Sequence, residues 1–380
     1  MSRKESLALT SLILLSILLA FAGGYLTHDL VAGEGAALPL LERAHGILVE
    51  HAYDPVPENP ALEYGMIRGM IEAYGDPFTS FSEPAQHELQ SDSLQGSFGG
   101  IGVSFELDTE GRVRLYPFPD GPAAGAGMED GDILLRVDDL AIEPEVPVDT
   151  ITAAIRGPEG TEVRIVVLRE PGEAELEFEI ERMQVPLPSV TWRLAPEDAR
   201  IGLIEVNVVA ESTPGEIERA AEDLEAQGAE FYVLDLRDNG GGLLQAGIDC
   251  ARLFLTDGVV IHQQFKGEPV ETHEVERPGR LAELPLAVWV NHGTASAAEI
   301  CAGALQAHGR APLIGAPTFG KDAIQLVFEL EDGSSIQVTA AKWWFPELGF
   351  PNGEEGLLPD LPAEDNDAFI RVTNGLMNTE

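Results

Sequence analysis

The feature that most constrains the fold is a regular alternation of strand and helix patterns between residues 201 and 315. Apolar runs such as "FYVLDLR" and "PLAVWV" predict strands buried on both faces, and the runs between them carry apolar residues at helical spacing. Right-handed crossovers make such an order an open α/β sheet. Functional residues in these sheets lie at the carboxyl ends of the strands, where this sequence places the glycines 240–242 and the segment "NHGTAS" ending at Ser296.

The sequence before this core contains two other kinds of pattern. Runs such as "LPLLERAHGILVEHAY" and "ALEYGMIRGMIEAYG" predict helices, whereas "DILLRVD", "EVRIVVLRE" and "ELEFEIE" predict short strands, with helical patterns at "PAAGAGM" and "VDTITAAIR". A capping box at Thr213 and Glu216 is expected to start the first core helix. The predicted parts are a leader 1–27, a helical region 28–95, a small barrel-like β domain with two helices 96–184, the α/β core 185–365 and a tail 366–380.

The amino terminus predicts export. Residues 6–27 are uncharged and rich in Leu, Ile and Ala, which is long enough to span a bilayer, and Arg3 and Lys4 precede them. Ala20 and Ala22 also fit a small-x-small cleavage site. A membrane anchor and a cleaved signal peptide are therefore alternatives, and either places the body of the protein outside the cytoplasm, periplasmic or extracellular.

Composition narrows the classes of partner. A net charge of -42 disfavours nucleic acid, since no basic stripe interrupts the acidic surface. Two cysteines, Cys250 and Cys301, exclude a disulfide framework and a cysteine zinc site, leaving two buried thiols or a single bridge. No His or carboxylate set stands at ligand spacing, so we expect neither a metal nor a cofactor, and a homo-oligomer is left open.

Ser296 is the candidate nucleophile. A turn between strand and helix exposes its hydroxyl, and the N–H groups at the helix start can face a developing oxyanion. The same placement suits an ordinary helix N-cap. His292 has no evident way to present a nitrogen to Ser296, and His308 lies at the far end of the helix, although a Ser-His-Asp triad is not excluded.

Lys321 is the other candidate base. The chain has four lysines against nineteen arginines, and this one lies in the glycine turn "PTFGKDAIQ". Lysine, unlike arginine, can lose its proton when burial lowers its pKa. A solvated lysine in a turn is the alternative.

The segment "VNHGTASAAEICAGALQ", followed 25 residues after Ser296 by Lys321 in "TFGKDAIQ", resembles the serine-lysine peptidases of the carboxyl-terminal processing family. The resemblance implies a ClpP/crotonase-like core, with Ser296 as nucleophile, Lys321 as base and Gln325 holding the lysine amine. "LDLRDNGGGLLQAG" resembles the block that supplies an oxyanion amide, which implies Gly241, or Gly242 beside it, together with the amide of Ala297. Gly240 stands where the family often has proline. Asn239 is expected to shape the loop and Glu299 to be structural.

The resemblance covers roughly residues 40–365. "YGDPFTSF" resembles the N-terminal segment of the family, "AAKWWFP" and "EEGLLPDLPA" its closing strands, and "PAAGAGMEDGDILLRVD" its PDZ domain. In "GGIGV" successive amides could receive a terminal carboxylate, and the strand that begins at Val103 could pair with an extended peptide. The substrate-binding residues expected there are Gly99, Gly100, Ile101, Gly102 and Val103. A β module without a ligand is the alternative.

These patterns predict an exported serine endopeptidase that cleaves proteins near their free C-termini through a Ser296–Lys321 dyad and an acyl-enzyme. The alternatives are a peptidase-like scaffold that binds peptide tails without cutting them and a Ser-His hydrolase of lipid or wall esters.

Overall fold

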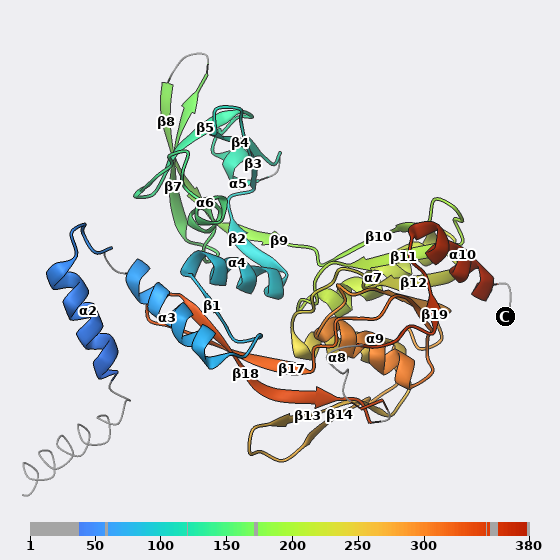
Figure 1. Ribbon diagram of the computed structural model, residues 1–380. Helices are drawn as coiled ribbons and strands as arrows, with labels where there is room; N and C mark the ends of the chain where they lie inside the picture. Colours follow the sequence, from blue (N-terminus) through green and yellow to red (C-terminus); the bar gives the residue numbers. More distant parts are fainter. Residues whose placement is uncertain are drawn as a thin grey trace, which may run out of the picture. The chain divides into compact units, whose positions relative to one another are not determined.

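The computed structural model describes residues 38–57, 60–119, 121–170, 174–346, 348–349 and 356–377 (Figure 1). The chain divides into two compact units, residues 1–66 and 67–380, and the boundary falls within α3 (Ala61–Tyr74). Helix α2 (Pro39–His51), in the first unit, has no buried residue. The expected membrane segment 6–27 lies outside the described residues, and no helix within the described ranges is long and apolar enough to cross a membrane.

The predicted α/β core is a six-stranded sheet. Its strands follow the order β10-β11-β12-β15-β16-β19, all parallel except β10, which runs antiparallel to β11. The bounds are β10 Val190–Leu194, β11 Ile201–Val206, β12 Phe231–Asp235, β15 Leu286–Val290, β16 Leu313–Gly315 and β19 Leu361–Pro362. The parallel order brings the ends of β12 and β15 side by side, as the sequence predicts.

Both faces of this sheet are covered, which explains its continuous apolar strands. In β12, Tyr232 and Leu234 pack with the helices on one face, and Phe231 and Val233 pack with the C-terminal helix on the other. The helices on the first face are α7 (Thr213–Ala226), α8 (Leu244–Phe254) and α9 (Ala297–Ala307), and α10 (Asn366–Met377) covers the second. Both cysteines are free and buried among them, so no bridge forms, and burial raises the pKa of Cys301 to about 12.

A second sheet flanks the core. Strand β18 (Ser335–Trp344) is its centre and pairs antiparallel with β1, β13 and β17, while β14 pairs with β13. The bounds are β1 Ser80–Ser82, β13 Val259–Phe265, β14 Glu271–Glu274 and β17 Ala323–Glu329. The turn before β17 carries Lys321, and β1 ties the segment that follows α3 to the same sheet.

The β domain has the predicted character. One sheet follows the order β3-β4-β5-β7-β8, with β6 beside β5, and strands β2 and β9 pair where the domain begins and ends. The bounds are β2 Ser97–Gly100, β3 Val103–Leu107, β4 Val113–Pro117, β5 Asp132–Val137, β6 Leu140–Ala141, β7 Glu162–Arg169, β8 Ala174–Glu181 and β9 Met183–Pro186. The two predicted helices are α5 (Pro122–Gly125) and α6 (Val148–Ile155).

One local expectation needs correction. Helix α7 begins at Thr213 with Ser212 as its N-cap, and the expected capping box does not form. The Glu216 carboxylate instead accepts hydrogen bonds from the backbone N–H groups of Ser189 and Val190, both at 2.9 Å, because its side chain is buried against that segment. Helix α4 (Pro84–Gln95) lies within the predicted helical region 28–95, but it has no buried residue and no apolar stripe that marks it individually.

Candidate active site

Ser296 lies at the junction between strand β15 and helix α9 in an unusual backbone conformation. Its φ is +55° and its ψ is −120°, a combination that is rare for a residue with a side chain. The turn is held by tertiary hydrogen bonds: Thr294 Oγ1 donates to the Leu236 carbonyl at 2.8 Å, and the Ala295 N–H donates to the Asn239 carbonyl at 2.9 Å. The loops after β12 and β15 are therefore joined, and the turn leaves Ser296 partly exposed.

The glycine loop after β12 lies directly against this serine. Gly241 has a φ of +100°, and a Cβ at this position would lie 2.9 Å from Ser296 Cβ and 3.0 Å from the backbone nitrogen of Ala297. Buried Asn239 shapes the loop as expected: its Oδ1 accepts from the Gly241 N–H at 2.8 Å, and its Nδ2 donates to the Val206 carbonyl at 2.7 Å. The Gly241 amide, expected in the oxyanion hole, already has a partner in Asn239.

One buried carboxylate joins the serine turn to the lysine turn. Glu299 is fully buried in the first turn of α9, and its Oε2 accepts from the backbone N–H groups of Ser296 at 2.8 Å and Lys321 at 2.9 Å. Its Oε1 accepts from Thr318 Oγ1 at 2.6 Å and from the Gly320 N–H at 2.7 Å. Burial raises the pKa of Glu299, although these four hydrogen bonds act in the opposite direction. The Glu299 carboxylate thus binds the backbone N–H groups of both candidate catalytic residues and fixes the two turns relative to each other.

The Lys321 amine is held in a partly buried setting. Burial lowers the pKa of Lys321, against the opposing charges of Glu299 and Asp76. Nζ lies 5.2 Å from the centre of the Phe78 ring, and it makes no hydrogen bond or ion pair within the described part of the chain. A lysine in this environment is suited to lose its proton, which a solvated surface lysine is not.

Gln325 is placed near the start of β17, just after a bulge between Ile324 and Gln325. Its Nε2 is buried without a hydrogen-bond partner, and no hydrogen bond joins it to Lys321 in the described structure. Its role in holding the lysine amine stays a prediction.

His292 and His308, the two histidines weighed as alternative bases, contact other groups. The His292 ring packs on Phe319 with 5.8 Å between ring centres, and His308 Nε2 lies 2.9 Å from the Val259 carbonyl oxygen. None of the histidines in the described ranges hydrogen-bonds to Ser296, so these contacts give the Ser-His alternative no support.

The β domain contains a groove of about 230 Å³ beside its edge strand β3. Gly100, Ile101, Gly102 and Val103 line it as expected, together with apolar side chains that include Phe105, Phe118 and Ile155. Gly99 does not line the groove. Its carbonyl accepts from the Gly157 N–H at 3.1 Å, and a Cβ at Gly99 would clash with the Gly157 oxygen, so close packing explains this glycine.

Comparisons with known proteins match both parts of the molecule. A model of peptidase family S41 matches residues 200–363, and a PDZ-domain model matches residues 116–169. Carboxy-terminal processing protease CtpA of Bacillus subtilis is 32% identical over 338 residues, covering 86% of this chain and 71% of that protein. A carboxyl-terminal-processing protease of Synechocystis is 36% identical over 308 residues, covering 79% and 71%. The chain belongs to the carboxyl-terminal processing proteases of family S41.

This carboxyl-terminal processing protease is thus a serine-type peptidase with a PDZ domain, and the resemblance seen in the sequence is confirmed. Among solved structures, a photosystem II D1 C-terminal processing protease aligns with a TM-score of 0.47 and 28% identity, over 88% of this chain and 91% of that one.

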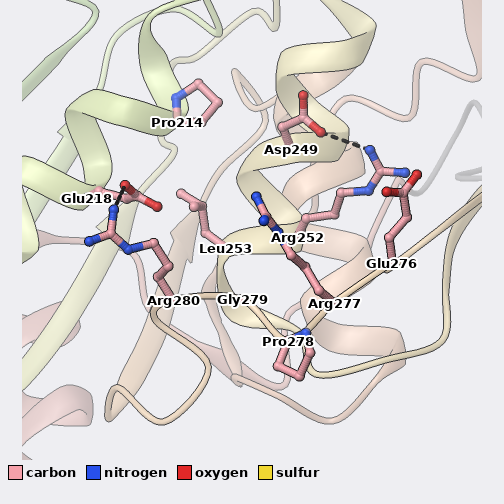
Figure 2. A pocket seen from close by; sticks show the side chains of 10 residues that line it. All are labelled: Pro214, Glu218, Asp249, Arg252, Leu253, Glu276, Arg277, Pro278, Gly279 and Arg280. Atoms are coloured by element: carbon pink, nitrogen blue, oxygen red, sulfur yellow. Dashed lines mark hydrogen bonds and ion pairs between the residues drawn. The ribbon is translucent and has the colours of Figure 1, made fainter.

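Another hollow lies apart from this site. It has a volume of about 780 Å³ and is enclosed by α7, α8 and residues 276–280 (Figure 2). Two of its arginines are already paired, Arg280 with Glu218 at 2.7 Å and Arg252 with Asp249 at 2.9 Å. None of its lining residues contributes to the Ser296 and Lys321 turns.

Two contacts of the site could not be inferred from residue patterns. Phe78 reaches Lys321 from the turn between α3 and β1, far away in the chain, and only the resemblance marked its segment. Glu299 was expected to be structural, but its link to the lysine turn depends on tertiary folding that spacing does not encode.

Proposed function

We propose that this protease is an exported endopeptidase in which Ser296 is the nucleophile and Lys321 the general base. The observation that carries the proposal is the shared anchor: Glu299 binds the backbone N–H groups of both residues, beside a lysine whose pKa burial lowers. One carboxylate fixes both the turn with the hydroxyl and the turn with the desolvated amine. This arrangement suits an enzyme that catalyses acyl transfer better than a protein that only binds peptides.

In the first step the neutral Lys321 amine takes the proton of the Ser296 hydroxyl as Oγ attacks the scissile carbonyl carbon. The amide of Ala297, at the start of α9, stabilises the oxyanion, and the Gly241 amide joins it by sharing or releasing its bond to Asn239. The protonated lysine then gives its proton to the leaving amine as the C–N bond breaks, which leaves an acyl group on Ser296.

In the second step Lys321 takes a proton from water, whose oxygen attacks the acyl carbon. Collapse of the second tetrahedral species breaks the ester bond and returns the proton to Ser296 Oγ. Gln325 lies close to the lysine in sequence, and we assign it to holding the amine during these transfers.

The PDZ groove is proposed to receive the free C-terminus of the protein substrate. Strand β3 is an edge strand, so an extended tail can add to it, and the backbone amides of residues 100–103 line the groove where the terminal carboxylate would lie. The apolar lining of the groove suits an apolar last residue.

Export is proposed from the leader alone. Residues 6–27 and the basic pair Arg3 and Lys4 direct the chain out of the cytoplasm, as an anchor or as a cleaved signal peptide.

The test is incubation of the purified protease with a panel of denatured proteins, followed by mass spectrometry of the fragments. New C-termini are expected with the intact enzyme and none with Ser296→Ala, whose fold should be unchanged because the hydroxyl is not part of the core. Equal cleavage by the alanine variant would remove Ser296 from the mechanism. Tail binding without any cleavage by the intact enzyme would favour a scaffold that captures peptides.

A further inference from the structure

The 76–79 turn connects α3 to β1 and is fixed rigidly to the second sheet. Asp76 Oδ2 accepts a hydrogen bond from Thr79 Oγ1 at 2.5 Å, and Thr79 Oγ1 accepts one from the Thr339 N–H at 3.3 Å. Strand β1 continues the attachment, because Ser80 and Phe81 pair with Gln337 and Ile336 of β18. The position of the turn is therefore set by the strand that also holds β17.

Phe78 projects from this turn onto the lysine. Its ring centre lies 5.2 Å from Lys321 Nζ and 6.4 Å from the ring centre of Phe319 in an edge-to-face arrangement. Phe319 is 43% exposed and is itself in contact with the His292 ring. Among the described residues, Phe78 is thus the aromatic ring that lies over the lysine amine, and Phe319 contacts the Phe78 ring.

The ring acts on the lysine in two opposing ways. Its quadrupole favours the charged amine by about 0.5–1 kcal/mol, as in other cation–π pairs. Excluding water disfavours the charged amine, and burial can shift a pKa by up to about 3–5 units. The two carboxylates that face Lys321, Glu299 on α9 and Asp76 on the turn, both favour the charged form, so exclusion of water is what makes a neutral lysine accessible.

We propose that Phe78 is a positioning residue for the general base: its ring keeps water from Lys321 Nζ and so sets the pH above which the lysine can accept the Ser296 proton. This rests on the proposed dyad. The N-terminal segment then takes part in the chemistry of a site otherwise built from the α/β core.

The test is the rate at which a small fluorophosphonate labels Ser296 in the full chain, measured from pH 5 to pH 10. This reagent reports the activation of the serine without requiring a protein substrate. Phe78→Ala opens the amine to water, whereas Phe78→Leu keeps an apolar cover and removes only the quadrupole. Phe328→Ala is the matched control, because Phe328 is a 51% exposed phenylalanine on β17, and in the described part of the chain its ring does not lie over Lys321.

For Phe78→Ala we expect the midpoint of the pH profile to rise by about one unit, which lowers labelling near neutrality about 10-fold, with the same plateau rate at high pH. Phe78→Leu should keep the midpoint of the unchanged enzyme or lower it slightly, and Phe328→Ala should change nothing. An unshifted midpoint in Phe78→Ala, or an equal loss of rate at every pH, would overturn the proposal.

The two proposals fail in different ways. If Lys321→Met is labelled as fast as the unchanged enzyme, the dyad itself is wrong. If Lys321→Met is not labelled but Phe78→Ala keeps the midpoint, the dyad stands and only the role of Phe78 is lost.

Discussion

Gly240 and Gly241 are adjacent in the loop after β12, yet only Gly241 lies against Ser296. Gly240 has open space around the position of a Cβ, whereas Gly241 has a φ of +100° and lies against Ser296 and Ala297. The sequence shows three equal glycines in a row. Their different roles follow from which backbone atoms the folded loop brings close.

Gly241→Ala should therefore lower kcat/KM about 10²-fold, comparable with the loss of one oxyanion donor, because the new methyl group occupies the space beside the Ala297 nitrogen. Gly240→Ala is the matched control and should retain activity. Steady-state kinetics measures kcat/KM for both variants. If the two lose activity equally, the whole loop is sensitive to substitution and Gly241 has no role that Gly240 lacks.

Glu299→Gln should lower turnover by roughly 10- to 100-fold, because an amide nitrogen must replace one carboxylate oxygen that accepts from two donors. Glu216→Gln is the control, since Glu216 is another buried carboxylate that binds backbone N–H groups, away from the site. Both variants should unfold more easily. If Glu216→Gln lost as much turnover per folded molecule as Glu299→Gln, reduced stability alone would explain the loss of activity in the Glu299 variant.

At the scale of elements, the alternation of strands and helices could be predicted because both faces of the core sheet are buried. The pattern of β12 and β15 indicates this directly, since every residue of both strands is buried. Helix α4 and strand β1 could not be predicted in this way, because α4 has no buried residue and β1 is three residues long. The segment that positions Phe78 thus carried no periodic signal.

Helix α10 illustrates how a terminal element supports the site. Arg237, just before the glycine loop, pairs with Asp235 at 2.6 Å and donates to Asn366 Oδ1 at 2.7 Å. Its guanidinium also lies over the rings of Trp289 and Phe369, at 4.7 and 4.6 Å. The C-terminal helix therefore braces the end of β12 from the second face of the sheet.

Phe369→Ala should lower the free energy of unfolding by about 3–5 kcal/mol, because it leaves a cavity beside Trp289 and removes one ring from Arg237. Arg371→Ala, at an exposed position of the same helix, is the control. Its free energy of unfolding should stay within about 0.5 kcal/mol of that of the unchanged protein. Urea denaturation measures both. A small loss in the Phe369 variant would mean that α10 contributes little to the core.

At the scale of the whole molecule, the site combines segments that the sequence keeps far apart. The serine turn, the lysine turn and the glycine loop come from the α/β core and could be predicted from their motifs, whereas Asp76 and Phe78 come from before the PDZ domain. Contacts of this kind depend on the pairing of β1 with β18, which no local pattern specifies.

Recognition by the PDZ domain should depend on the free carboxylate of the substrate. A protein with an amidated C-terminus should be cleaved about 10-fold more slowly than its free-acid twin, because the amides of residues 100–103 lose a charged acceptor. Short peptides that reach the catalytic site directly should show a smaller difference. Equal rates for the two proteins would show that the groove does not read the terminal carboxylate.

The proposed mechanism requires Lys321 to act as a neutral base for Ser296. The most direct measurement is the rate of fluorophosphonate labelling of Ser296 near neutral pH in Lys321→Arg. Arginine keeps the charge and most of the length of lysine but cannot become neutral, so we expect labelling to fall by roughly 10²–10⁴-fold, as far as in Lys321→Ala. Labelling of the arginine variant at the rate of the unchanged enzyme would contradict the account, because Lys321 would then be a structural cation and another group the base.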